Sequence, residues 1–261
     1  MDPPISSSAN PTIKLVRSLQ RREGRDLERA FILEGRRAVA DAVAAGIAPT
    51  LVLADEAVGA NQVAFLPASV QVRRVASRLF ASLADTQHPQ GVLAVVPVPK
   101  IDPPLTETPL TLIVDGVRDP GNLGTLLRSA AAAGADRAVL LPTTVDAFNP
   151  KVVRAGMGAH VRLSITWADA EAIQHLARAR EVVALLTADG DAAIDEVDWT
   201  RPAAIVVGGE AFGPSELGKS LATVRTRIPL TGGVESLNAG VAGSIALFEA
   251  SRQRRAQIRR L

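Results

Sequence analysis

The feature that most constrains the fold is the regular alternation of β-like and helical segments after residue 107. The strand candidates are the apolar runs at 110–114, 138–141, 182–186, 203–207 and 226–228. The helix candidates among and after them are 122–133, 150–157, 169–180, 214–221 and 236–255. Such alternation is typical of βαβ units, whose parallel strands are covered by helices on both faces. We therefore predict an α/β fold class with a parallel sheet in this half of the chain.

A proline-rich segment separates this half from the residues before it. Four of the eight residues from Pro97 to Pro104 are proline, which fixes the backbone angle φ and removes hydrogen-bond donors. Before it, shorter β-like runs at 30–33, 50–53, 70–75 and 91–98 alternate with helical stretches. We predict four segments: a disordered leader at 1–11, a smaller N-terminal α/β domain at 12–97, a linker at 98–106 and a C-terminal domain at 107–261.

Composition excludes several functional classes. Hydrophobic residues make up 47% and charged residues 21% of the chain, which is typical of a globular protein. No run approaches the length of a transmembrane helix, about 18 consecutive apolar residues, and the N-terminus lacks the pattern of a signal peptide. The absence of cysteine excludes disulfides and thiolate metal sites and fits a cytoplasmic protein. His88, His160 and His175 have no metal-ligand spacing, so we predict no metal and no membrane association.

Basic residues are concentrated near the N-terminus, although the net charge is only +2. Eight basic residues stand against four acidic ones between positions 14 and 37. The candidates for contacts with RNA phosphates in this stretch are Arg17, Arg21, Arg22, Arg25, Arg36 and Arg37. Arginine suits bidentate phosphate contacts, but a solvated helix face would show the same pattern, so both interpretations stay open. The chain has no tyrosine and few other aromatic residues, which argues against a β-sheet stacking platform for RNA.

Three short strings, each placed where a β-like run meets a glycine turn, are the candidate functional elements. The first covers 115–124 (DGVRDPGNLG) and is followed by Arg128; the second covers 206–213 (VVGGEAFG), and the third covers 227–238 (RIPLTGGVESLN). Ligand sites of α/β proteins lie at such strand ends. In the third string, Ser236 is a natural N-cap for the last helix.

Together and in this order, the three strings resemble the motifs of the SpoU branch of the SPOUT RNA methyltransferases, which methylate the ribose 2′-hydroxyl of RNA using S-adenosylmethionine. The resemblance implies a SPOUT domain with a trefoil knot, S-adenosylmethionine as cofactor, no metal, and a homodimer. The N-terminal half is similar to the L30e-like RNA-binding domain of the family, on the strings 31–36 and 86–92. Such a domain favours ribosomal RNA as the substrate, with transfer RNA as the alternative.

The resemblance also assigns roles to single residues. The catalytic set is Arg128, Asn122, Glu210, Ser236 and Asn238; the cofactor-binding set is Val207, Gly208, Ile228, Leu230 and Leu237; further RNA contacts fall to Lys151 and Arg154. A guanidinium holds its proton throughout the physiological pH range and is therefore a poor base. We therefore expect Arg128 to position the RNA phosphate and ribose and to stabilise developing alkoxide charge. Where relatives usually have serine and an apolar residue, this chain has Gly156 and His160.

The last helical stretch underlies the dimer prediction. One stripe of it carries the apolar residues Leu237, Val241, Ile245 and Phe248, beside the small residues Gly240, Gly243 and Ser244. Small residues let two helices approach closely. We therefore expect this face to pack against a second copy in a two-fold dimer.

Two other functions compete with this interpretation. A non-catalytic RNA-binding protein could keep the fold, although the retained Asn122, Arg128 and Glu210 argue against decay of the site. Residues 213–220 also match the phosphate-binding pattern G-x-x-x-x-G-K-S of nucleotide hydrolases. That match does not begin at the strand end, and Glu216 would place a carboxylate in a cradle meant for phosphates, so we interpret it as a chance match.

Overall fold

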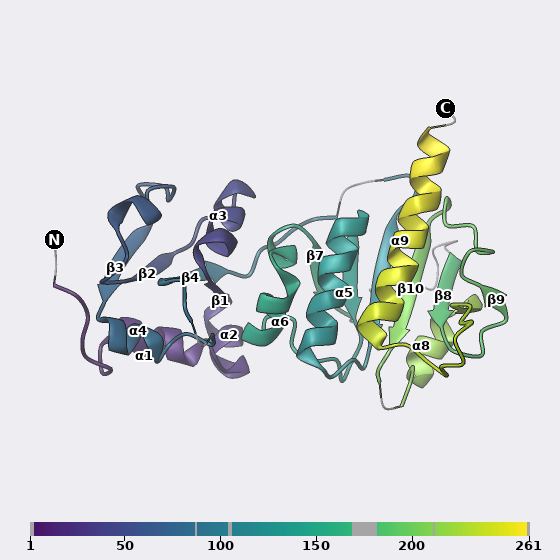
Figure 1. The fold of residues 1–261 in the computed structure, drawn as a ribbon, viewed down its shortest axis with the longest axis horizontal. Helices are drawn as coiled ribbons and strands as arrows, with labels where there is room; N and C mark the ends of the chain where they lie inside the picture. The colour runs from purple at the N-terminus through teal and green to yellow at the C-terminus, as the bar shows by residue number, and fades with distance from the viewer. Residues whose placement is uncertain (1–2, 87, 104–105, 169–181, 211, 260–261) are drawn as a thin grey trace. The chain divides into compact units, whose positions relative to one another are not determined.

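The computed structural model describes residues 3–86, 88–103, 106–168, 182–210 and 212–259 (Figure 1). The helix predicted at 169–180 lies outside these residues. The chain divides into two compact units, Met1–Lys100 with Phe148–Val161, and Ile101–Ala147 with Arg162–Leu261. None of the described helices combines the length and the apolar composition that crossing a membrane requires.

The first unit is built on a four-stranded sheet in the order β1-β4-β2-β3. Its strands are β1 (Ala30–Glu34), β2 (Leu51–Asp55), β3 (Gln71–Val75) and β4 (Val92–Pro97). Strand β4 is antiparallel to both β1 and β2, whereas β2 and β3 are parallel. Its other described elements are α1 (Pro11–Ser18), α2 (Arg22–Glu28), α3 (Arg36–Ala44), η1 (Ala60–Gln62), α4 (Ser77–Ala81), α6 (Pro150–Gly156) and η2 (Ala159–Val161).

Successive residues of a strand point to opposite sides of the sheet. Both faces of this sheet are buried, because other elements of the unit pack on each of them. On one side, Ile32 and Leu93 pack with Ile13 of α1 and Phe80 of α4. On the other side, residues of β1 pack with α3 and α6, including Phe31, Leu33, Val39, Ala42 and Val153. The alternation of apolar residues in the sequence thus corresponds to two cores that share one sheet.

The prediction of a disordered leader at residues 1–11 is wrong from Ile5 onward. Ile5 is buried, its N–H donates to the carbonyl oxygen of Arg74 at 2.9 Å, and its own carbonyl oxygen accepts from the N–H of Ala76 at 3.0 Å. The contact extends the edge of the sheet beside β3. Helix α1 then begins at Pro11, with Asn10 as N-cap. A single isoleucine between prolines and serines gives little sequence signal, yet it is buried against the edge of the sheet.

The segment 148–161 belongs to the first unit, although it falls within the predicted C-terminal domain at 107–261. Val153 and Val161 join the core that contains Phe31, and the Phe31 and Phe148 rings lie 5.1 Å apart. A Cβ atom at Gly156 would lie 2.8 Å from Cε1 of the buried His160. The two departures from the family pattern are therefore linked, because glycine at 156 leaves the space that the imidazole at 160 occupies.

The second unit contains a seven-stranded sheet in the order β7-β6-β5-β10-β8-β11-β9. The strands are β5 (Leu110–Asp115), β6 (Arg137–Leu140), β7 (Ser164–Trp167), β8 (Val182–Leu186), β9 (Ala192–Ala193), β10 (Ala203–Gly208) and β11 (Val224–Arg227). All pairings between them are parallel, which confirms the predicted α/β class. The central strands are continuous apolar runs because helices and loops cover both faces. The trefoil knot stays a prediction of the family resemblance.

Helices α5 (Pro120–Ala133) and α9 (Ala239–Ile258) lie side by side (Figure 1). A Cβ atom at Gly243 would lie 2.3 Å from Cδ2 of Leu126, and the hydroxyls of Ser129 and Ser244 are 2.7 Å apart. The small-residue face of α9 is thus used for packing within the chain. Its predicted role in the dimer is wrong for these residues, because helix α5 already occupies the space that their short side chains leave.

The C-terminal half of α9 is fastened by Arg254. Its guanidinium donates to the carbonyl oxygens of Trp199 at 2.8 Å, Arg201 at 2.9 Å and Pro109 at 3.2 Å. Burial lowers the pKa of Arg254, although nearby Asp136 opposes this effect. The side chain therefore ties the last helix to the residues that precede β5 and β10.

Candidate cofactor and RNA site

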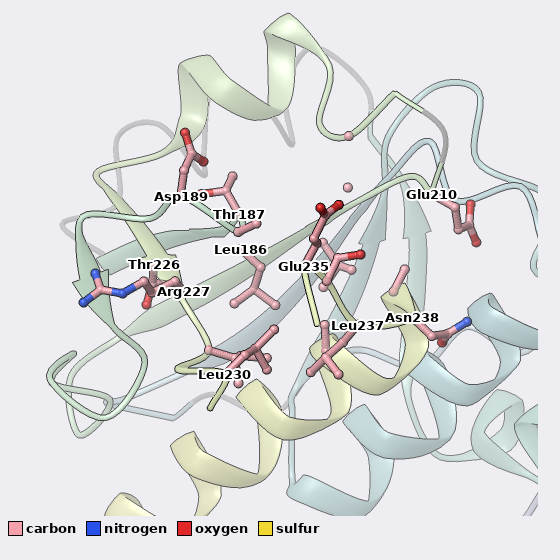
Figure 2. A pocket seen from close by; sticks show the side chains of 18 of the residues that line it. Leu186, Thr187, Asp189, Glu210, Thr226, Arg227, Leu230, Glu235, Leu237 and Asn238 are labelled. Carbon is pink, nitrogen blue, oxygen red and sulfur yellow. The ribbon is translucent and has the colours of Figure 1, made fainter. Parts of the chain in front are cut away.

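The three motifs meet at one edge of the parallel sheet in the second unit. Strands β5 and β10 are neighbours, with Asp115 opposite Gly208, so the first and second motifs begin side by side. The third motif begins at the end of β11, which is separated from β10 by β8 in the sheet. A cavity of about 980 Å³ lies there, at the carboxyl ends of the strands (Figure 2). This is the position where open parallel sheets bind their ligands.

The cavity walls contain every residue that the sequence assigned to the cofactor. These are Val207, Gly208, Ile228, Leu230 and Leu237. Leu186 at the end of β8 adds an apolar side chain that the sequence analysis did not select. Figure 2 shows Leu186, Leu230 and Leu237 near one another on the side of the cavity where α9 begins. The cavity thus offers an apolar surface to a flat ring.

Charged side chains lie at the rim of the cavity. Asp189 and Glu235 line it, and the Asp189 carboxylate forms an ion pair with Arg225 at 2.5 Å. The hydrogen bond from Arg225 holds the pKa of Asp189 below its usual value. The charge of Arg225 offsets that of Asp189, and Arg227 also lines the cavity, so charges of both signs surround it.

Two glycines of the second motif allow backbones to touch. A Cβ atom at Gly208 would lie 2.5 Å from the backbone nitrogen of Pro214, and one at Gly209 would lie 2.3 Å from the carbonyl oxygen of Gly116. Both distances are too short for any side chain. The loop after β10 therefore packs directly on the loop after β5, and this contact brings the first two motifs together.

Three of the predicted catalytic residues form one hydrogen-bonded chain. The side-chain amide of Asn122 donates to Glu210 at 2.6 Å, and its carbonyl oxygen accepts from the amide of Asn238 at 2.9 Å. Asn238 in turn accepts from the N–H of Val241 at 3.2 Å and caps α9. The network joins all three motifs. Ser236 also lines the cavity. It was predicted to be the N-cap of the last helix, but the N-cap is Asn238, two residues later.

A buried carboxylate that was not among the predicted site residues lies near this network. Asp115, the last residue of β5, is 1% exposed and accepts from the backbone N–H of Ser215 at 2.6 Å. A Cβ atom at Gly218 would lie 2.2 Å from its carboxylate oxygen. An aspartate at the end of an apolar strand is the signal that could have found it. Its role is to hold the loop between β10 and helix α8 (Glu216–Leu221).

The same contacts exclude the phosphate-binding interpretation of residues 213–220. The amide of Ser215 is occupied by the Asp115 carboxylate, and the Lys219 ammonium pairs with Glu216 at 2.7 Å. A phosphate in this loop would meet the negative charge of Asp115. We conclude that the pattern match has no phosphate-binding function.

Arg128 stands apart from the other four predicted catalytic residues. It is exposed on α5, it does not line the cavity, and within the described part of the chain its side chain has no hydrogen bond or ion pair. Six residues separate it from Asn122, which corresponds to roughly 9 Å along the helix and about 240° around it. The two side chains therefore leave α5 in different directions.

The predicted RNA-binding residues of the first unit have different surroundings. Arg25 is buried and donates to the carbonyl oxygen of Leu19 at 2.8 Å, so its assignment to RNA is wrong. Arg154 forms an ion pair with Asp85. Arg36 donates to the carbonyl oxygen of Gln62 at 3.1 Å and lies over the Phe65 ring. The predicted residues with exposed side chains are Arg17, Arg21, Arg22, Arg36, Arg37, Lys151 and Arg154.

Histidine and carboxylate side chains do not gather into a potential metal site in the part of the chain that the structure describes.

The parallel sheet, the edge cavity and the three motifs around it define a methyltransferase domain of the SPOUT class. Residues 109–248 match the SpoU rRNA methylase family, and residues 10–94 match the MRM3-like substrate binding domain. The chain belongs to the SpoU rRNA methylase family.

Relatives and solved structures agree with this family. The chain is 34% identical to mouse mitochondrial rRNA methyltransferase 3 over 90% of its own length and 70% of that protein. It is 30% identical to the Bacillus subtilis 23S rRNA (guanosine(2553)-2′-O)-methyltransferase, which covers 94% of this chain and 97% of that protein. The AdoMet-bound rRNA methyltransferase from Sinorhizobium meliloti superposes with a TM-score of 0.83 at 30% identity, covering 96% and 97% of the two chains. The SpoU methyltransferase AviRb from Streptomyces viridochromogenes gives 0.85 at 27% identity, covering 95% and 99%.

Proposed function

We propose that this protein transfers a methyl group from S-adenosylmethionine to the 2′-hydroxyl of a ribose in ribosomal RNA, which leaves S-adenosylhomocysteine and releases the hydroxyl proton to water. The observation that supports this most strongly is the Glu210–Asn122–Asn238 network beside a cavity of about 980 Å³ that has both apolar and polar walls. The match to the SpoU rRNA methylase family and the similarity to rRNA methyltransferases support ribosomal RNA as the substrate.

The cavity fits the chemistry of S-adenosylmethionine. The cofactor combines a flat adenine ring with a positively charged sulfonium and an amino-acid group. Leu186, Ile228 and Leu230 would enclose the adenine, while the carboxylate of Glu235 would favour the positive charges. When bound, the cofactor supplies a methyl group that is already electrophilic. We therefore propose that no metal ion is needed to activate it.

The side chains of the network would hold the ribose for reaction. Asn122 is fixed from both sides, by Glu210 and by Asn238, so its amide has one orientation. Such fixed polar groups position a hydroxyl for attack without reorganising during the reaction. Arg128 would contact the adjacent phosphate and stabilise negative charge that develops on the 2′-oxygen. The carboxylate of Glu210 also accepts from the backbone N–H of Arg118 at 3.4 Å, which keeps it in place.

Calorimetric titration with S-adenosylmethionine separates this function from that of a non-catalytic RNA-binding protein. We expect saturable binding in the cavity. An absence of binding at millimolar cofactor would support the non-catalytic alternative. Transfer of labelled methyl groups to ribosomal RNA transcripts, compared with transfer RNA transcripts, then decides the substrate class.

We also propose that the protein acts as a homodimer through the outward face of α9. Val241, Ile245 and Phe248 form an apolar stripe there and are 46%, 39% and 45% exposed. The neighbouring helix α5 exposes Thr125, Arg128 and Ala132. Because Arg128 lies outside the cavity of its own chain, a second copy that packs on these helices is a way to complete the site.

Replacing Phe248 with glutamate should convert the dimer into a monomer that binds the cofactor but transfers no methyl groups. The reason is that a buried unpaired carboxylate opposes association. Sedimentation velocity measures the change, with Leu27→Glu as the control, because Leu27 is 81% exposed in the first unit. A wild-type protein that is active as a monomer would contradict the dimer.

Neutralising Arg17, Arg21 and Arg36 with glutamine should weaken RNA binding and reduce its salt dependence. The slope of log affinity against log salt should fall by roughly 0.7–0.9 for each RNA phosphate that an arginine no longer neutralises. Cofactor affinity should not change, because all the residues that line the cavity belong to the second unit. Arg25→Gln is the matched control. It should lower the free energy of unfolding instead, because it breaks the buried bond to Leu19. Unchanged affinity and slope would leave these arginines as a solvated surface.

A further inference from the structure

Phe212 is an exposed aromatic residue in a chain that has few aromatic residues. Its side chain is 85% exposed, more than any other large hydrophobic side chain in the described residues. Single exposed apolar residues are common on protein surfaces and need no explanation by themselves. The position of this one is informative, because it follows Glu210 of the catalytic network by two residues.

The local backbone presents both side chains from one short tip. Gly209 and Gly213 pair with each other, and the N–H of Gly213 donates to the carbonyl oxygen of Gly209 at 3.0 Å. Glu210 and Phe212 both lie between these two glycines. The tip is anchored at its base, because Gly209 packs on the carbonyl oxygen of Gly116 and Glu210 is bonded to Asn122.

A guanidinium group accompanies the ring. The Cζ atom of Arg118 lies 6.0 Å from the centroid of the Phe212 ring, which is a cation–π distance. Arg118 is also exposed, and its backbone N–H donates to Glu210. The pair therefore joins an open aromatic face to a positive charge. These are the groups with which proteins hold unpaired bases and the phosphates beside them.

We propose that the Phe212 ring stacks on an unpaired RNA base, the one attached to the ribose that is methylated. Arg118 would hold the Phe212 ring from the face opposite the base. The inference rests on the proposed function and names a residue that positions its substrate. Two residues of chain span at most about 7 Å, and a base is attached to the carbon next to the one that carries the 2′-hydroxyl. A ring at position 212 is therefore at the right distance from a ribose held by the network at Glu210.

The test compares substitutions that separate the aromatic face from apolar size. With a ribosomal RNA transcript as substrate, Phe212→Ala should raise KM for RNA by about 10- to 100-fold. Phe212→Leu should behave like Phe212→Ala, because leucine lacks an aromatic face, whereas Phe212→Trp should keep nearly wild-type KM. Cofactor affinity by calorimetry should be equal in all variants. Leu27→Ala is the control for removal of an exposed apolar side chain. A Phe212→Leu enzyme with wild-type KM would overturn the proposal.

A second measurement does not depend on methyl transfer. The fluorescence of Phe212→Trp, taken as the difference from wild type, should be quenched when the transcript is added. Ile258→Trp, at a position 71% exposed on α9, should not be quenched. If the wild-type enzyme transfers no methyl group but tryptophan at 212 is selectively quenched, the proposed function fails and the base contact stands. Equal quenching at both positions, or none at 212, overturns the base contact.

Discussion

Replacing Arg128 with alanine should reduce methyl transfer at least about 100-fold, the reduction typical of removing a residue that stabilises transition-state charge. The fold and the cofactor affinity should stay nearly unchanged. The structure supports a loss of catalysis without a loss of folding or cofactor binding. Arg128 is exposed, its side chain has no hydrogen bond or ion pair with another described residue, and it does not line the cavity. Single-turnover transfer, circular dichroism and calorimetry measure the three quantities.

Arg128→Lys distinguishes positioning from charge alone. An ammonium cannot reproduce the planar pair of donors, so we expect this variant to fail nearly as badly as the alanine variant. Arg201→Ala, at another exposed position, should keep wild-type transfer. An Arg128→Ala enzyme with near wild-type turnover would remove this residue from the catalytic set.

Replacing Gly209 with alanine should eliminate most methyl transfer for a different reason, because it displaces the loops that form the site. The new methyl group would lie 2.3 Å from the carbonyl oxygen of Gly116 and 2.9 Å from its carbon. These are backbone atoms, so the loops after β5 and β10 must move apart. The Glu210–Asn122 bond and the cavity wall at Gly208 would move with them. A displacement of about 1 Å in such a site costs roughly 100-fold in rate.

Gly232→Ala provides the matched control for this prediction. Gly232 lies in the third motif, but a Cβ atom there would meet nothing within 4 Å. We expect Gly232→Ala to retain wild-type transfer and cofactor affinity. If Gly209→Ala retained both as well, the packing of one loop on the other would not be what forms the site.

The strands could be predicted because apolar runs such as 110–114 and 203–207 are buried on both faces of a parallel sheet. Short or polar strands escaped prediction: β9 has only two residues, and β7 carries Ser164 and Thr166. The segment 148–161 was assigned to the wrong unit, because the sequence shows an amphipathic helix without showing which core receives its apolar face.

The cofactor residues could be predicted from their motif positions, because backbone and apolar groups at strand ends leave a specific pattern. The surroundings of the charged and the small residues could not be predicted from the sequence. Arg25 and Arg21 look alike in the sequence, yet one is buried against a carbonyl oxygen and the other is exposed. Gly243 looked suited to contact a second copy, yet Leu126 of the same chain occupies that space. Both outcomes depend on tertiary packing, which composition and spacing do not record.

We propose above all that the methyl group is placed on a ribose oxygen of ribosomal RNA. The most direct measurement is mass spectrometry of nucleosides from a ribosomal RNA transcript treated with the enzyme and S-adenosylmethionine that carries an isotopically labelled methyl group. We predict label in one 2′-O-methylated nucleoside, abolished by Arg128→Ala and insensitive to Arg201→Ala. Label on a base, or no label in ribosomal RNA while transfer RNA is labelled, would contradict the account.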